Sequence, residues 1–358
     1  MLASAANAST STSRCRAEAG KRSRRGATFS TAGVRACPTG HRDGHGAAMR
    51  RHAPLPPTYD DAPFRVVDAL NDGVTKGRLR GTDLEVPFRR VRSAPITDVH
   101  GLASAYATVI PPHHAFAGLT AGRLWGLPIA QAWARAEPLV IARPNRSAPG
   151  YARGTRQIAY DATRLSRTLL GGLPVLEPLP TALTLARELS HEALVQVLDA
   201  LLTPSRWYPG LKVPREPERG HVTLEEIDAF LVACRGLTGV PALRAAATDA
   251  RVGVDSRFET VTRLLIVEAG LPEPVVHPLV VADGIDHHPD LAYPELRIAI
   301  EYEGDGHRDE RQWHVDIERY ARLEAVGWTT VRVTRDHLAR RGAHFVARIR
   351  RAIALRER

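Results

Sequence analysis

Three acidic residues near the end of the chain, Asp290, Glu301 and Glu303, have the types and the spacing that can bind a metal ion. In a β-strand, Glu301 and Glu303 would project from one face about 6–7 Å apart. A preceding strand paired with this one would bring Asp290 alongside them. Clustered carboxylates repel one another and raise some of their pKa values, and a divalent cation relieves that repulsion. Oxygen ligands without a thiolate favour Mg²⁺ or Mn²⁺ over Zn²⁺.

Such a centre would be suited to phosphodiester hydrolysis. A bound cation can activate water and stabilise the extra charge on the phosphate in the transition state. The alternative is a solvent-exposed strand face whose carboxylates pair with arginines such as Arg297 or Arg319. The spacing by itself leaves both interpretations open.

The segment around these acids predicts the order helix, three strands, helix, strand, helix. Asp255 or Ser256 can cap a first helix that ends at Gly270. Its expected buried stripe consists of Phe258, Val261, Leu264 and Leu265. The run PVVHPLVV predicts one strand, and HHPDLAYPELRIAIEYEG predicts two more joined at Pro294-Glu295. In the last of them, alternation places Ile298, Ile300 and Tyr302 opposite Glu301 and Glu303.

These residues resemble a known nuclease signature. Pro289-Asp290, followed after ten residues by Glu301-Tyr302-Glu303, looks like the PD-(D/E)XK motif on its αβββαβ core. The segments SRFETVTRLLIVEAGLPEP, DLAYPELRIAIEYEGDGH and GWTTVRVT, with Asp316 and Arg319, resemble the small domain related to very-short-patch repair endonucleases.

The resemblance implies a restriction-endonuclease-like domain over residues 250–358 that acts on DNA with Mg²⁺ or Mn²⁺. Asp290 and Glu301 would be the metal ligands, Glu259 an accessory acid, and His307 a group for proton transfer or ligation.

One position departs from the motif, because Glu303 stands where the family usually has lysine. No lysine follows Lys212, so none can replace it nearby. In that superfamily the lysine is thought to orient water and offset charge. The resemblance therefore allows two functions: a DNA endonuclease or nicking enzyme, or a DNA-binding regulator with a silent site.

Basic residues near the site are candidate DNA contacts. Arg308 and Arg311 follow the acids and can hold phosphate, and Arg348 and Arg351 lie on a basic final helix. The alternative is that arginines at a helix end only keep the protein soluble. His287 and His288 are expected to be exposed loop residues, although they precede Asp290 closely enough to touch the site.

Residues 53–135 predict a winged-helix-like region. A short helix ends at Gly73, Thr75 can cap a basic second helix suited to phosphate contact, and LEVPFRRVRS predicts a strand. The alternative is a small helical domain with a solvated basic face. ALNDGVTKGRLRG and LTAGRLWGLP resemble the winged-helix region of AbiEi-type antitoxins, which implies a toxin as partner.

Residues 136–236 are expected to be a mainly helical scaffold. PLVIARP predicts one buried strand, and a helix or helical pair is expected from near Thr181. Thr223 and Glu226 form a capping box for a later helix, on which Cys234 is expected to be a buried hydrophobe.

Composition excludes several classes of protein. No apolar run approaches the ~20 residues of a membrane helix, and three cysteines exclude a disulfide scaffold. The net charge of +10 is concentrated in residues 1–52 and in the last 24 residues, so a uniformly basic DNA-coating protein is also excluded. Residues 1–52 are expected to be a disordered basic tail, with Met49 as the true start. We expect a cytoplasmic α+β protein.

Overall fold

The computed structural model describes residues 52–150, 152–216, 218–304 and 310–357. It confirms a mixed architecture in which helices and β-sheets both contribute, as the α+β class predicts. Nearly all of the expected tail, residues 1–52, lies outside the described residues. Within the described ranges, no helix combines the length and the apolar character needed to cross a bilayer.

The first segment has few regular elements: η1 (Pro57–Tyr59), β1 (Phe64–Arg65), α1 (Val66–Asn71), η2 (Arg78–Arg80) and β2 (Val91–Arg92). The prediction of a strand over LEVPFRRVRS was wrong for most of the segment, of which only Val91–Arg92 forms a strand. Pro87 has no N–H to donate to a ladder, and Arg90 adopts a left-handed φ of 66°. The expected basic helix is the single turn η2, where Arg78 binds the Asp83 carboxylate at 3.0 and 2.6 Å. Both terminal nitrogens of Arg78 are therefore engaged by Asp83 within the fold.

A five-stranded mixed sheet follows, and it corrects the expectation of a mainly helical region over 136–236. Its strands and the preceding helices are α2 (Val99–Ala107), β3 (Ala115–Phe116), α3 (Gly118–Leu124), β4 (Leu139–Pro144), β5 (Thr155–Tyr160), β6 (Arg167–Leu170) and β7 (Leu173–Leu176). The strand order is β5-β4-β3-β7-β6. PLVIARP forms β4 as predicted, whereas β5 and β6 are half-exposed strands without a strong apolar pattern.

Four helices complete this part of the molecule: α4 (Pro178–Leu185), α5 (His191–Leu202), α6 (Leu224–Ala233) and α7 (Val240–Asp249). The capping box of Thr223 and Glu226 is present at the start of α6, and Cys234 is fully buried, both as predicted. One hydrophobic cluster contains residues from Phe88 to Ala250. The boundary expected between residues 135 and 136 therefore falls inside a continuous core.

The last segment keeps the predicted order of elements, with one hairpin added. Its elements are α8 (Arg257–Glu268), β8 (Val275–Val276), β9 (Val280–Ala282), β10 (Ile285–His287), β11 (Leu291–Tyr293), η3 (Pro294–Leu296), β12 (Ile298–Glu303), α9 (Glu310–Ala325), β13 (Thr329–Thr334), α10 (Arg335–Leu338), η4 (Ala339–Gly342) and α11 (Ala343–Arg356). The sheet order is β13-β12-β11-β8, and β9 and β10 pair only with each other. Strand β12 runs parallel to β13 and antiparallel to β11.

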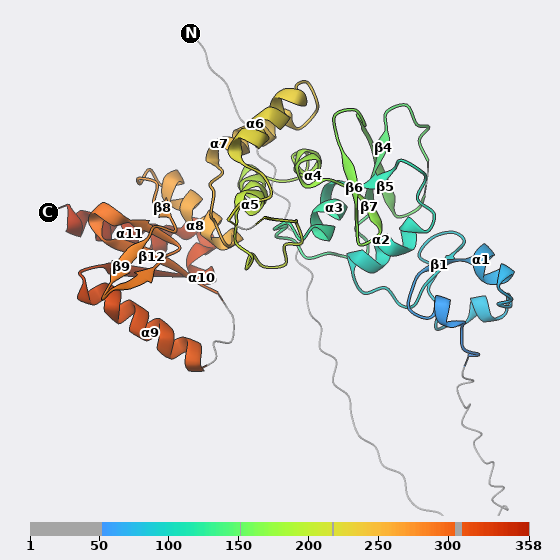
Figure 1. The fold of residues 1–358 in the computed structure, drawn as a ribbon, viewed down its shortest axis with the longest axis horizontal. Coiled ribbons are helices and arrows are strands. Elements are labelled where there is room, and N and C mark those ends of the chain that lie inside the picture. Colours follow the sequence, from blue (N-terminus) through green and yellow to red (C-terminus); the bar gives the residue numbers. More distant parts are fainter. Residues whose placement is uncertain (1–51, 151, 217, 305–309, 358) are drawn as a thin grey trace, which may run out of the picture. The chain divides into compact units, whose positions relative to one another are not determined.

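The two faces of β12 differ as the alternation predicts. Ile298 and Ile300 share a core with Ile266 of α8 and with Phe345 and Ile349 of α11. Helix α9 covers the opposite side of the sheet (Figure 1), where its Arg319 reaches a carboxylate of β12. The acidic face is therefore covered by a helix and is not a solvated surface.

Helix α8 buries only part of the expected stripe. Leu265 is buried as predicted, but Phe258, Val261 and Leu264 are only half-buried, and Thr260 and Arg263 are buried in addition. The cause is a polar network that links α8 to α5.

At the centre of this network lies Asp199 of α5. Its Oδ2 accepts hydrogen bonds from Arg263 Nη2 at 3.1 Å and from Thr260 Oγ1 at 2.9 Å. Arg263 Nη1 also donates to Glu273 Oε1 at 2.9 Å. Burial raises the pKa of Asp199 to about 6, although Arg263 and these hydrogen bonds act in the opposite direction. The network fixes α8 against α5.

Candidate metal centre

Three donor side chains meet beside the C-terminal sheet: Glu259 of α8, His277 after β8 and Asp290 before β11. One potential ligand atom from each lies within 4.8 Å of the others. Glu259 is buried, and the other two are half-buried. His277 Nε2 lies 3.1 Å from Glu259 Oε2. These side chains come from three separate elements, so only the fold brings them together.

The start of β11 positions Asp290. Leu291 is the first residue of β11 to pair with β12, opposite Ile300. Beyond that pair, the backbone N–H of Tyr302 donates to Asp290 Oδ2 at 2.6 Å. The carbonyl of Asp290 accepts the N–H of His277 at 3.2 Å. The Asp290 carboxylate therefore takes the place of a strand partner where β11 and β12 diverge.

Helix capping positions Glu259. The Ser256 side chain accepts the N–H of Glu259 at the N-terminus of α8, as the sequence predicts for one of its two candidate caps. Glu259 Oε2 in turn accepts the N–H of Asp255 at 2.9 Å. A carboxylate in the first turn is also favoured by the helix dipole. Glu259 is thus fixed by local structure and directed at His277.

The carboxyl group of Asp290 is strongly perturbed. Burial is the largest cause, followed by the negative charges of Glu259 and Glu301, and together they raise the pKa of Asp290 to about 8. The Tyr302 hydrogen bond and His277 offset only part of this rise. The environment therefore disfavours the ionised form of Asp290, and a bound cation would offset that cost.

The histidine experiences opposing effects. Burial lowers the pKa of His277, but its hydrogen bond to Glu259 and the charges of Glu259, Asp255 and Asp290 outweigh burial, so the pKa is raised. His277 Nδ1 lies 3.8 Å from Asp255 Oδ2. His277 is not among the predicted site residues, because a single histidine before a proline carries no spacing signal.

Glu301 and Glu303 occupy different surroundings. Glu301 is 3% exposed, and its Oε2 accepts a hydrogen bond from Arg319 Nη2 at 3.1 Å. The negative charge of Glu301 contributes to the raised pKa of Asp290, so Glu301 lies near the cluster. Glu303 forms an ion pair with Arg332 of β13 and is not one of the three clustered donors. An ion pair between a carboxylate of this strand and Arg319 was expected if the acids formed a structural strand face without a metal.

The other predicted site residues lie outside this cluster or outside the described residues. His307 and Arg308 lie outside the described residues, and the side chain of Arg311 is not described either. Arg348 donates to the carbonyl of Arg332 at 3.0 Å, and Arg351 is exposed on α11.

The two histidines before Asp290 differ from each other. His288 is exposed as expected, but the prediction was wrong for His287, which is buried in β10. Burial, with Arg319 and Arg322 nearby, lowers the pKa of His287. Neither histidine belongs to the cluster of donors.

The donor set suits a hard divalent cation. Glu259 and Asp290 offer carboxylate oxygens, His277 offers one imidazole nitrogen, and Glu301 lies close enough to act on Asp290. A mainly oxygen set without thiolate is typical of Mg²⁺ and Mn²⁺ sites. If such an ion binds here, Glu259, His277 and Asp290 are the residues that would hold it.

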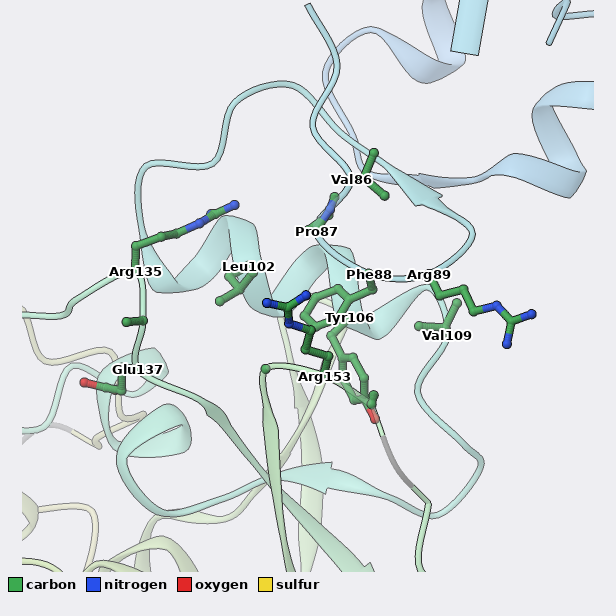
Figure 2. A pocket seen from close by; sticks show the side chains of 13 residues that line it. Val86, Pro87, Phe88, Arg89, Leu102, Tyr106, Val109, Arg135, Glu137 and Arg153 are labelled. Carbon is green, nitrogen blue, oxygen red and sulfur yellow. The ribbon is translucent and has the colours of Figure 1, made fainter. Parts of the chain in front are cut away.

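A separate cavity of about 870 Å³ lies in the N-terminal half of the chain. Figure 2 shows the rings of Phe88 and Tyr106 near its centre, with Arg153 beside them and Arg89 extending away. Its acid, Glu137, is neutralised by Arg123 at 2.8 Å. None of the clustered donors lines it, so the cavity is not part of the candidate centre.

Comparison with known proteins adds two relatives. They are the uncharacterized proteins MT2308 of Mycobacterium tuberculosis strain CDC 1551 / Oshkosh and Rv2248 of strain H37Rv, each 30% identical over 190 residues. The match covers 52% of this chain and 64% of each relative. No family model and no solved structure matches. Because both relatives are uncharacterized, the likeness brings no activity with it.

Proposed function

We propose that this protein is a metal-dependent DNA endonuclease or nicking enzyme that hydrolyses phosphodiester bonds. The observation that carries the proposal is the convergence of Glu259, His277 and Asp290 within 4.8 Å, at the point where β11 and β12 diverge. The order of elements from α8 to β13 supports it, because it agrees with the αβββαβ core that the PD-(D/E)XK resemblance implies.

Each residue of the candidate centre would have a separate role. Asp290, Glu259 and His277 would bind the ion, and the Tyr302 N–H would keep the Asp290 carboxylate oriented. Arg319, paired with Glu301, would place positive charge beside the acids where the motif's lysine is missing. When bound, Mg²⁺ or Mn²⁺ would supply an activated water and stabilise charge on the phosphate.

The remaining parts of the proposal concern DNA and location. The region around α1 and η2 is proposed as a winged-helix-like DNA contact in which Lys76 and Arg80 are exposed, whereas Arg78 is engaged by Asp83. A cytoplasmic location is proposed because Cys234 is the one cysteine of the body of the chain and is unpaired, which is typical of a reducing compartment.

The direct test is nicking of supercoiled plasmid DNA with Mg²⁺ or Mn²⁺. The wild-type chain is expected to convert the plasmid to the nicked form, and Asp290→Ala is expected to leave only background. Asp286→Ala is a matched control, because Asp286 is exposed on β10 and outside the cluster. Equal background from the wild type and Asp290→Ala would reject the nuclease.

One observation favours a second function. Glu301 and Glu303 already bind Arg319 and Arg332, and His277 Nε2 lies 3.1 Å from Glu259 Oε2. A centre balanced by its own cations is what a silent site in a DNA-binding regulator would show. Such a regulator, similar to an AbiEi-type antitoxin and with a toxin as partner, would retain DNA without cutting it.

Replacement of His277 tests whether it is a ligand. His277→Ala is expected to weaken Mn²⁺ binding by about 10–100-fold, because the change removes a donor and releases Glu259 from its hydrogen bond. Isothermal titration calorimetry with Mn²⁺ would measure the change. His288→Ala, at an exposed position near Asp290, is expected to bind like the wild type. Equal affinity of both variants would remove His277 from the ligand set.

A further inference from the structure

The loop between α5 and α6, residues 203–223, carries an unusually exposed aromatic side chain. Trp207 is 89% exposed, although the next residue, Tyr208, is buried. Tryptophan and tyrosine are enriched at binding interfaces, where the ring is apolar and one edge is polar.

The loop holds this tryptophan in a defined place. The N–H of Trp207 donates to Ser205 Oγ at 3.2 Å, and the N–H of Lys212 donates to the carbonyl of Trp125 at 2.8 Å. The carbonyl of Gly210 approaches Gly126 so closely that a Cβ there would lie 1.8 Å from it. Trp207 is therefore displayed on an anchored loop.

The same loop contains a guanidinium with one unsatisfied N–H donor, Arg215 Nη1. Arg215 Nη1 is buried and has no hydrogen-bond acceptor among the described residues. Burial lowers the pKa of Arg215, and nearby Arg206 lowers it further, while Asp255 partly compensates. A buried guanidinium N–H without an acceptor favours an anion as its partner.

The loop also adjoins the candidate metal centre. At its base, Thr203 Oγ1 donates to Asp255 Oδ1 at 3.3 Å. Asp255 is the residue whose N–H binds Glu259 and whose carboxylate lies 3.8 Å from His277. The base of the loop therefore contacts the residue that positions Glu259.

We propose that Trp207, Arg206 and Arg215 bind one unpaired nucleotide of a DNA strand next to the metal centre, with its phosphate at the two arginines and its base against the indole. The base must be unpaired, because bases within a duplex already stack on their neighbours and offer no free face. The inference rests on the proposed function for the identity of DNA as the substrate. It assigns substrate contact to a region that sequence analysis treated as scaffold.

Binding without catalysis tests this proposal. The full chain in EDTA would be titrated against a fluorescein-labelled thymidine oligomer of about 15 nucleotides, followed by anisotropy. Trp207→Ala is expected to weaken binding by about 5- to 150-fold, the scale of one lost base stack, and Trp207→Phe to restore most of the affinity. Arg215→Gln is expected to lower the slope of log affinity against log salt concentration by about 0.7, the value for one lost phosphate contact.

Matched controls exist for both changes. Leu169→Ala removes another exposed apolar side chain, and Arg219→Gln removes an arginine of the same loop that Glu226 already neutralises at 2.5 Å. Neither is expected to change affinity or salt dependence. Trp207→Ala is expected to melt at the wild-type temperature, since the side chain is exposed.

The outcomes separate this inference from the proposed function. Wild-type affinity in Trp207→Ala and Arg215→Gln would overturn the inference even if the wild type nicks plasmid DNA. An equal loss with a duplex of the same sequence would overturn the assignment of an unpaired base. Weakened single-strand binding in both variants would support the inference even if no nicking occurs.

Discussion

Asp290→Asn is expected to abolish metal-dependent nicking and, at the same time, to make the protein more stable at pH 8. Loss of the carboxylate should leave only background nicking, because the ion loses one of its ligands. The amide keeps an oxygen that can accept the Tyr302 N–H, so the local backbone can remain as it is. A gain in stability with a loss of activity is the signature of a strained functional group.

The pH dependence follows from the raised pKa. The pKa of Asp290 is about 8 in the native protein, against an ordinary value of 3.8 that is expected in the unfolded chain. Between these values the native state binds a proton that the unfolded state has lost, so the free energy of unfolding of the wild type falls as pH rises from about 4 to about 8. The amide of the Asp290→Asn variant does not titrate, so the variant's advantage grows through this window to about 2–5 kcal/mol above pH 8.

Denaturant unfolding at pH 5 and pH 8.5, with and without Mn²⁺, would measure both effects. Mn²⁺ is expected to stabilise the wild type at the higher pH and to leave Asp290→Asn unchanged. Asp286→Asn, at an exposed position, controls for the change of a carboxylate to an amide. A variant less stable than the wild type at pH 8.5 would show that the ionised carboxylate supports the fold, contrary to this account.

Arg263→Met is expected to lower the free energy of unfolding by about 3–5 kcal/mol, because it leaves the buried carboxylate of Asp199 without its cation. Both side chains of this pair are about 1% exposed or less. Because Arg263 lies one turn from Glu259 on α8, Mn²⁺ affinity is also expected to fall. Chemical denaturation and calorimetry would measure the two quantities on the same protein.

Arg322→Met is the matched control for that change. Arg322 forms an exposed i,i+4 pair with Glu318 at 2.8 Å, a kind of pair worth about 0.5 kcal/mol or less. The double variant Arg263→Met with Asp199→Leu is expected to recover part of the loss, since it removes both charges. A loss below about 1 kcal/mol in Arg263→Met would mean that the network does not hold α8 in place.

Local signals in the sequence predicted the elements around the site correctly. Ser256 caps α8, Gly270 follows its end, and the alternation in β12 separates Ile298 and Ile300 from Glu301. Such signals act within a few residues, so a single segment contains all the information needed. The same is true of the capping box at Thr223.

Contacts between distant segments could not be predicted in this way. The burial of Arg263 on α8 depends on Asp199, which lies 64 residues earlier in the chain. Of the sheet over residues 139–176, only β4 was predicted; β5 and β6 were missed because they depend on pairing with β4 and β7 for their strand geometry. Partners far away in the chain decide both features.

The sequence by itself determined the types of residue at the site: Asp290 and Glu301 on neighbouring strands, Glu259 at a capped helix start, and no lysine to accompany them. The tertiary structure alone decided which of these residues meet. It added His277, turned Glu303 toward Arg332 and placed Trp207 on a loop anchored beside the acids. The physical reason is that periodicity and capping determine which face of a helix or strand a side chain occupies and where that element begins. Whether side chains from separate elements meet depends on how those elements pack.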